Sequence, residues 1–131
     1  MPVFSKKSLE RLATCHDDLQ VVCHAAIKEM DFMVVCGHRG EADQNKAFAE
    51  GKSKLKYPDS KHNKTPSLAV DLAPVKLVDG KTIIDWNDIE AFRKLAVILL
   101  HIAGGRGIPL IWGGHWVKFK DYPHFELKKG D

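Results

Sequence analysis

The sequence predicts an α+β fold in which a small, mostly antiparallel sheet is flanked by helices. Two long segments, 8–30 and 87–102, repeat apolar residues at helical spacing. Short apolar runs of strand length lie between and after them, and Asp79-Gly80 separates two of these runs as a strong hairpin signal. Long helices combined with short strands and a hairpin indicate the α+β class.

The helices are predicted from apolar spacing and from residues that cap helix ends. Ser8 to Met30 carries Leu, Val, Ala and Met at helical intervals, and we expect one amphipathic helix there. Glu41 to Ala49 fits a short helix. Asn87 followed by Glu90 resembles an N-cap with its partner, and it opens a helix that Gly104-Gly105 should terminate.

Two of the predicted strands carry polar side chains that can line a cleft. With the two-residue period of a strand, His124 and Glu126 face one side, and the apolar residues between and after them face the other. Asp71 is the single charge in an apolar run, and an unpaired buried carboxylate is unfavourable, so it should meet a cation or hydrogen-bond donors. The predicted strands are Phe32 to Gly37, Leu68 to Ala73, Val75 to Val78, Lys81 to Ile84, Ile108 to Trp112 and His124 to Leu127.

His62, Asp71 and His124 form a candidate set of metal ligands. Two histidines and one acid are a set that catalytic zinc sites use, while a fourth position stays open for water. Asp121 precedes His124 by three residues, across the Tyr122-Pro123 turn, so it could reach a metal-bound water without being a ligand. From spacing alone, hydrogen-bonded structural roles for these residues are as plausible as a metal site.

The order of these motifs resembles a family of zinc peptidases. Ser60-Lys61-His62, Ala69-Val70-Asp71 and the segment 121–127 are similar to the Ser-x-His, Ala-x-Asp and acid-x-x-His pattern of vancomycin-resistance-type D-alanyl-D-alanine dipeptidases and carboxypeptidases. Segments 34–40 and 111–116 resemble the family's arginine-ending strand and its Trp-Gly-Gly segment. The resemblance covers most of the chain, and the branch of phage L-alanyl-D-glutamate endopeptidases fits best.

Two positions depart from the family pattern. His62 and Asp71 are nine positions apart, which is longer than the usual spacing by about two, and a longer surface loop adds little closure entropy. We interpret the insertion as a rebuilt loop that keeps both ligands. His115 stands where family members often have an acid, and its role stays open.

The resemblance implies a fold of the hedgehog or D-alanyl-D-alanine peptidase type, with Zn²⁺ in a cleft of the sheet. His62, Asp71 and His124 would hold the ion, which would lower the pKa of bound water and polarise the scissile carbonyl. Asp121 would act as the general base and pass the proton to the leaving amine.

Further residues have expected roles at this site. Arg39 would offer a forked cation to the oxyanion or to a substrate carboxylate, or else form a surface salt bridge. Ser60 and Gln44 would line the substrate groove, or serve as a cap and a loop-stabilising contact. Glu126 would orient an imidazole or substitute for Asp121 as the base, and His115 would be an additional imidazole near the metal.

The substrate implied by the resemblance is the peptidoglycan stem peptide, cut between L-alanine and D-glutamate. A D-alanyl-D-alanine carboxypeptidase and a non-catalytic, zinc-stabilised wall-binding domain are the alternatives. A free base such as Asp121 favours the enzyme, because purely structural zinc sites are usually closed by four protein ligands, and His115 is the residue that could close this one.

Length and composition fit one small catalytic domain over residues 1–131. The net charge of +3 is mild and the lysines are scattered, so no nucleic-acid partner is expected. The apolar run 95–102 is far shorter than the roughly 20 residues of a membrane span, and no apolar region of a signal peptide follows the first lysines. Cys15, Cys23 and Cys36 are an odd number and are expected as reduced thiols.

These features predict a monomeric phage lysis enzyme without a signal peptide. It would accumulate in the host cytoplasm, and it would depend on a holin or a similar membrane lesion to reach the cell wall.

Overall fold

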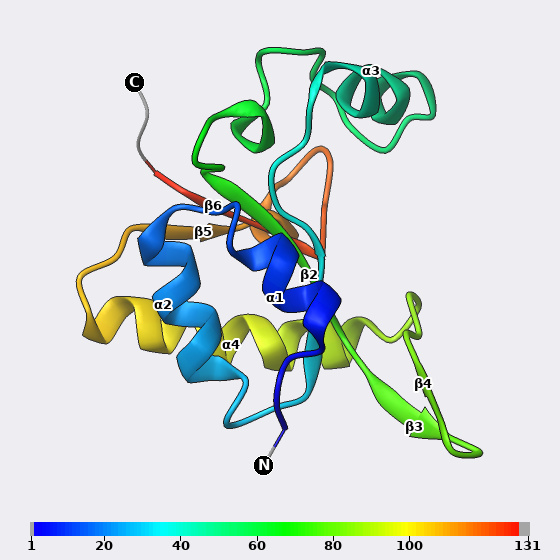
Figure 1. Ribbon diagram of the computed structural model, residues 1–131, viewed down its shortest axis with the longest axis vertical. Helices are drawn as coiled ribbons and strands as arrows, with labels where there is room; N and C mark the ends of the chain where they lie inside the picture. The colour runs from blue at the N-terminus through cyan, green and yellow to red at the C-terminus, as the bar shows by residue number, and fades with distance from the viewer. Residues whose placement is uncertain (1, 129–131) are drawn as a thin grey trace.

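The structure, a computed structural model that describes residues 2–128, contains a four-stranded sheet with helices packed on one face (Figure 1). The strand order is β1-β2-β6-β5, and every neighbouring pair is antiparallel. This confirms the predicted α+β class. The strands are β1 (Phe32–Cys36), β2 (Ala69–Pro74), β5 (Leu110–Trp112) and β6 (His124–Leu127), and β3 (Lys76–Val78) with β4 (Lys81–Ile83) forms a separate hairpin.

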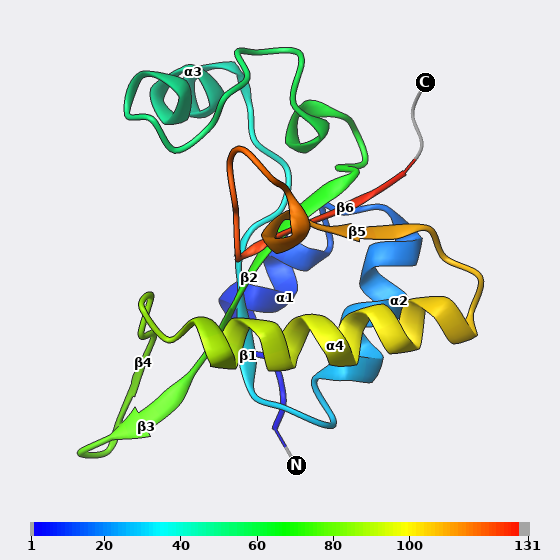
Figure 2. The same ribbon diagram turned by 180° about the vertical axis from the view of Figure 1, so that it is seen from behind.

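The helices divide into two groups. Figures 1 and 2 show α1, α2 and α4 around the lower part of the sheet, whereas α3 and the short η1 lie at its upper end. The helix bounds are α1 (Lys6–Leu12), α2 (Asp17–Ala26), α3 (Glu41–Ala49), α4 (Ile89–Gly105), η1 (Lys61–Asn63) and η2 (Gly113–His115). The helices within residues 2–128 are too short or too polar to span a bilayer.

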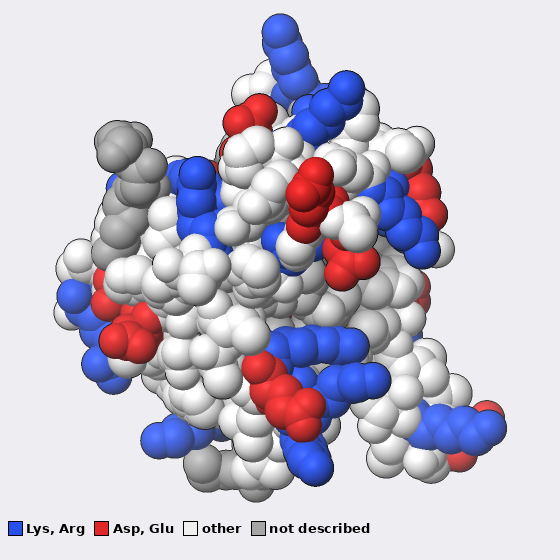
Figure 3. Space-filling view, turned by 45° about the horizontal axis from the view of Figure 1, so that its top comes forward, with Lys and Arg blue, Asp and Glu red and all other residues white. Residues whose placement is uncertain are grey.

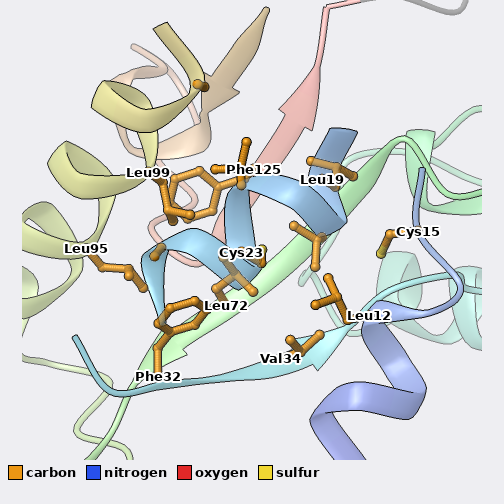
Figure 4. Close-up of a cluster of buried hydrophobic side chains, with 14 of the residues drawn as sticks. Leu12, Cys15, Leu19, Cys23, Phe32, Val34, Leu72, Leu95, Leu99 and Phe125 are labelled. Carbon is orange, nitrogen blue, oxygen red and sulfur yellow. The ribbon is translucent and has the colours of Figure 1, made fainter. Parts of the chain in front are cut away.

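The hydrophobic core fills the space between α1, α2 and α4 and one face of the sheet. Leu72 and Phe125 from the strands meet Cys23 and Leu95 from the helices, all at most 1% exposed (Figure 4). Alternate residues of β2 and β6 face this core, so Asp71 and His124 point to the opposite face, as the two-residue period predicts.

The predicted helix over 8–30 is wrong, because the chain forms two helices with a turn between them. α1 ends at Leu12, and α2 begins after His16, whose Nδ1 accepts a hydrogen bond from the Asp18 amide at 3.0 Å. In the turn, the His16 amide donates to the Ser67 carbonyl at 2.8 Å, which ties this segment to the chain just before β2. The helical spacing of apolar residues continues across the turn because α1 and α2 pack on the same core.

The helix over 87–102 is confirmed, but its ends differ from the expectation. Asp88 is the N-cap rather than Asn87, and its carboxylate accepts from the Ala91 amide at 3.2 Å. Gly104 and Gly105 form the last turn of α4, and the left-handed residue that follows is Gly107, with φ of 70°. The hairpin is confirmed with positive φ at both turn residues, Asp79 and Gly80.

Candidate metal centre and cleft

Strand register brings three potential ligands into one row across the sheet. Cys36 pairs with Asp71, and Asp71 pairs with His124. The register of β1 shifts between Val34 and Cys36, and this bulge turns Cys36 away from the core face that Val34 occupies. η1 adds His62, whose ring lies 5.1 Å from that of His124.

Two imidazoles aim at the same oxygen of Asp71. The Nε2 atom of His62 is 3.3 Å from Oδ1 of Asp71, and the Nδ1 atom of His124 is 3.2 Å from it. The opposite ring nitrogens face acceptors: His62 Nδ1 lies 2.8 Å from the Gly37 carbonyl, and His124 Nε2 lies 2.8 Å from a Glu126 carboxylate oxygen. A neutral imidazole carries one proton, so when that proton faces the Gly37 carbonyl or Glu126, the nitrogen that faces Asp71 has a lone pair.

Three electron-pair donors therefore converge at one point, and only extra protons or a cation can stabilise them together. In the metal-free protein, additional protons on the two imidazoles provide this stabilisation. Burial of the His62 ring alone would lower its pKa, but the Asp71 carboxylate and, to a smaller extent, Cys36 together outweigh burial and raise the pKa to about 10. His124 is likewise raised against the effect of burial, and the two imidazoles hold the pKa of the buried Asp71 carboxyl far below its usual range.

The geometry also fits a metal ion. With bonds of about 2.0–2.2 Å, adjacent ligands of a tetrahedral zinc ion are roughly 3.4 Å apart, close to the 3.2 and 3.3 Å observed here. The glutamate and carbonyl partners orient the two rings in the way that partners of metal-bound imidazoles usually do. The positions of His62, Asp71 and His124 are thus compatible with the predicted ligand set.

Cys36 is a potential ligand that the sequence analysis did not consider. Its sulfur, a His62 nitrogen and an Asp71 oxygen all lie within 4.8 Å of one another. Burial would raise the pKa of this thiol, but His62 outweighs burial and lowers it. Two overlapping ligand sets, one completed by His124 and the other by Cys36, therefore share His62 and Asp71.

Asp121 lies in the same cleft as His62 and His124. Its amide donates to the Gly113 carbonyl at 3.0 Å, and its carbonyl accepts from the His124 amide at 3.2 Å. A side chain at Gly113 would collide with the Asp121 backbone and press against His124, so glycine is required there. Burial, reinforced by the Asp71 carboxylate, raises the pKa of Asp121 to about 6, which suits a group that exchanges protons near neutral pH.

Arg39 lies beside Asp71 in a mostly buried ion pair rather than in an exposed salt bridge. One end of its guanidinium contacts Oδ2 of Asp71 at 3.3 Å, and the other donates to Oε1 of Gln44 at 3.0 Å. The side chains of Arg39 and Asp71 are each only 16% exposed. Arg39 also lines the cleft, so its fork joins a candidate ligand to the surrounding framework.

Gln44 is fully buried, and its amide is saturated with hydrogen bonds. Its nitrogen donates to the Leu55 carbonyl at 2.7 Å and to Ser53 Oγ at 3.0 Å, while its oxygen accepts from Arg39 and Asn63. A side chain with no exposed surface does not meet a substrate in this conformation. This arrangement favours the loop-stabilising role over the expected place in the substrate groove.

Ser60 acts as the cap of η1. Its hydroxyl accepts from the His62 amide at 3.2 Å, and the Asn63 side chain accepts from the Ser60 amide at 3.0 Å, which completes a capping box. Ser60 is buried but lines the cleft. Its contacts position the turn that carries His62.

Glu126 and His115 differ in their relation to the cluster. Glu126 contacts His124 with one oxygen and Lys61 Nζ with the other, at 3.0 Å. Burial alone would raise the Glu126 pKa, but these two partners lower it, so the carboxylate stays ionised as an acceptor for His124. His115 is exposed and packs edge-on against Trp112, 4.9 Å between ring centres, outside the residues that line the cleft.

The cleft has a volume of about 200 Å³ and lies between two loops. Residues 52–55 and 59–61 form one wall, and Trp116, Phe119 and Asp121 form the other. Trp116 packs its ring 5.1 Å from that of His124. Trp116 and Phe119 were not among the site residues predicted from the sequence, although two aromatic residues shortly before His124 were a usable signal. Figure 3 shows basic and acidic side chains interspersed over this end of the molecule, without a continuous basic surface.

Comparisons with known proteins agree on one family. The model of a family described as phage L-alanyl-D-glutamate peptidase matches residues 2–130. The L-alanyl-D-glutamate peptidase of Escherichia phage T5 is 38% identical over 129 residues, which cover 97% of this chain and 90% of the phage protein.

A bacterial relative and a solved structure extend this agreement. The peptidoglycan L-alanyl-D-glutamate endopeptidase CwlK of Bacillus subtilis is 31% identical over 112 residues, covering 79% of this chain and 64% of that protein. The crystal structure of the L-Ala D-Glu endopeptidase ChiX of Serratia marcescens superposes with a TM-score of 0.79 and 29% identity, covering 96% of this chain and 90% of that one.

Proposed function

The chain belongs to the phage L-alanyl-D-glutamate peptidase family, and we propose that it is a peptidoglycan peptidase that cuts the stem peptide between L-alanine and D-glutamate. The observation that carries this proposal is that His62 and His124 converge on Asp71 and also line a cleft together with Asp121. Three ligands with a carboxyl group beside them are the parts that a metallopeptidase needs.

We propose Zn²⁺ as the cofactor, held by His62, Asp71 and His124. When bound, the ion would supply Lewis acidity toward water and toward the scissile carbonyl. His124 is favoured over Cys36 as the third ligand because Glu126 already fixes its ring with the lone pair toward Asp71. The Cys36 thiol instead points to the Gly37 carbonyl, at 3.6 Å.

Asp121 is the proposed general base. Its pKa near 6 leaves it mostly ionised at neutral pH, so it can accept the proton of the attacking water and return it to the leaving amine. Glu126 holds His124, and Arg39 holds Asp71, so both act as positioning residues. Trp116 beside His124 supplies an apolar wall that limits water near the reacting atoms.

The biological setting is part of the proposal. As a phage lysis enzyme, the protein would act as a monomer, accumulate in the host cytoplasm, and reach the wall through a holin or similar membrane lesion. Its substrate would be the peptide of the cell wall, and it would not bind a nucleic acid.

Digestion of purified peptidoglycan, followed by mass analysis of the fragments, tests this function. We expect fragments with a new N-terminal D-glutamate and a matching C-terminal L-alanine. Release of free D-alanine would indicate the carboxypeptidase alternative. Zinc-replete protein that binds the wall without releasing any fragment would indicate a binding domain.

A further inference from the structure

We propose that Lys54 recognises the free carboxylate of the glutamate residue next to the scissile bond. This inference rests on the proposed function and adds a substrate-binding residue to it. Lys54 lies on the wall of the cleft opposite Asp121 and Trp116. The chemistry it would bind is a carboxylate on the leaving side of the cut.

Lys54 is the one cation of the cleft that the described residues leave without an acidic partner. Four cations line the cleft: Arg39, Lys52, Lys54 and Lys61. Arg39 pairs with Asp71, Lys52 with Glu50 at 3.3 Å, and Lys61 with Glu126. Among residues 2–128, no carboxylate lies within salt-bridge distance of Lys54, so its charge is available to a ligand.

A ring on the opposite wall fixes the position of this charge. The Lys54 ammonium lies over the face of Phe119, 5.0 Å from the ring centre. A cation–π contact of this kind restrains the long side chain but does not neutralise it, and N–H donors turned away from the ring remain free. The contact therefore holds an unneutralised donor between the two loops.

The substrate supplies a matching group. A glutamate residue uses one of its two carboxyl groups in the peptide chain, and the other stays free beside the bond that is cut. The sequence predicted Arg39 as a cation for the oxyanion or for a substrate carboxylate, but Asp71 and Gln44 occupy its guanidinium. Lys54 lacks such partners and is the better match to the free anion.

Two matched peptides and three variants test the inference. The peptides carry the L-alanyl-D-glutamate bond and differ only in whether the free carboxyl group is a carboxylate or an amide. The variants are Lys54→Met, Lys54→Arg and the control Lys56→Met. Lys56 lies two positions away, is also exposed and covers a ring, Phe48, at the same 5.0 Å, but it does not line the cleft.

We expect wild-type kcat/KM to favour the carboxylate peptide by about 10-fold or more, the range of a hydrogen bond to a charged group. Lys54→Met should remove most of this preference, Lys54→Arg should retain it, and Lys56→Met should leave it as in the wild type. An equal loss on both peptides in Lys54→Met, or an unaltered preference, would overturn the inference.

Calorimetric binding of the same two peptides to the metal-free protein separates this inference from the proposed function. Wild-type protein that cuts neither peptide, but binds the carboxylate form more tightly through Lys54, would refute the function and keep the recognition site. Cleavage of both peptides with equal binding in wild type and Lys54→Met would keep the function and refute the recognition site.

Discussion

The candidate metal cluster, formed by His62, Asp71 and His124, and the walls of the cleft lie side by side but are fixed in different ways. Asp71 and His124 are neighbours in a strand ladder, and His62 is held by the cap of η1. The walls are loops, in which Lys54 is exposed and is restrained by the Phe119 ring. Rigid strands suit donors that must keep their distances, whereas exposed loops suit contacts that select a substrate.

Gln44 links the two regions. It contacts Arg39, which holds Asp71, and it also holds the Leu55 carbonyl on the lysine-bearing loop. The loop that carries Lys54 is thus connected to Asp71 through Gln44 and Arg39, while Lys54 itself lines the cleft. Substitutions in the cluster should abolish function, those in the link should alter stability, and those on the walls should alter selectivity.

The largest expected effect is on turnover. Asp121→Asn should lower kcat by roughly 10²- to 10⁴-fold, the usual effect of removing a general base, while zinc content and thermal stability stay near wild type. Peptide hydrolysis and metal content of the same sample measure both. An inactive, zinc-replete Glu126→Gln beside an active Asp121→Asn would reverse the two roles.

Loss of the hydrogen bonds of Gln44 should lower the stability of the fold. Gln44→Leu keeps the volume but leaves Arg39, Asn63 and the Leu55 carbonyl short of partners, and each buried unsatisfied group costs about 1–3 kcal/mol. We expect the free energy of unfolding in urea to fall by roughly 3 kcal/mol. Asn45→Leu is the control, since Asn45 makes one exposed bond to the same loop and should change stability by less than about 1 kcal/mol. Equal losses in both variants would remove the special role of Gln44.

Arg39→Lys tests the fork at the junction of the two regions. An ammonium can contact either Asp71 or Gln44 but does not reproduce both guanidinium bonds. We expect kcat/KM to fall by about 10-fold, because Asp71 loses its fixed orientation. Wild-type kinetics in this variant would make the contact with Asp71 incidental.

A further prediction concerns the dependence of stability on pH. In the metal-free protein, the raised imidazole pKa values stabilise the fold fully below about pH 6.5, and this contribution is lost as pH rises toward 10. The depressed Asp71 pKa acts in the other direction, since its contribution is present above about pH 4 and is lost in acid.

Zinc binding requires neutral imidazoles, so its stabilisation should instead grow with pH. Between pH 6 and 9, the difference in Tm between zinc-loaded and metal-free protein should therefore widen, by an equivalent of about 1.4 kcal/mol per pH unit for each proton that zinc displaces. Calorimetric scans of both forms measure it. A constant difference would contradict protonated imidazoles in the metal-free cluster.

Local patterns predicted the parts of this molecule that depend on local sequence. The Asp79-Gly80 hairpin, the alternation of β6 and the polar face that carries His124 all follow from residues close in the chain. The resemblance to a known family added the pairing of distant motifs, and membership of the phage L-alanyl-D-glutamate peptidase family is confirmed.

Features that depend on tertiary contacts could not be predicted in this way. His16 lies at the start of α2, and its own amide donates to the carbonyl of Ser67, which is distant in the sequence. No residue pattern in the apolar run 32–36 predicts the bulge that turns Cys36 toward Asp71. Gln44 looks like an exposed helix residue until the loop that covers it is placed.

The zinc content of three purified proteins tests the central claim that His62, Asp71 and His124 hold the metal. Wild type and Cys36→Ser should each retain close to one zinc per chain, whereas His124→Ala should lose most of it. Circular dichroism of each sample would confirm that the fold persists. Loss of zinc from Cys36→Ser, together with its retention in a folded His124→Ala, would contradict the account and assign the metal to the ligand set that contains Cys36.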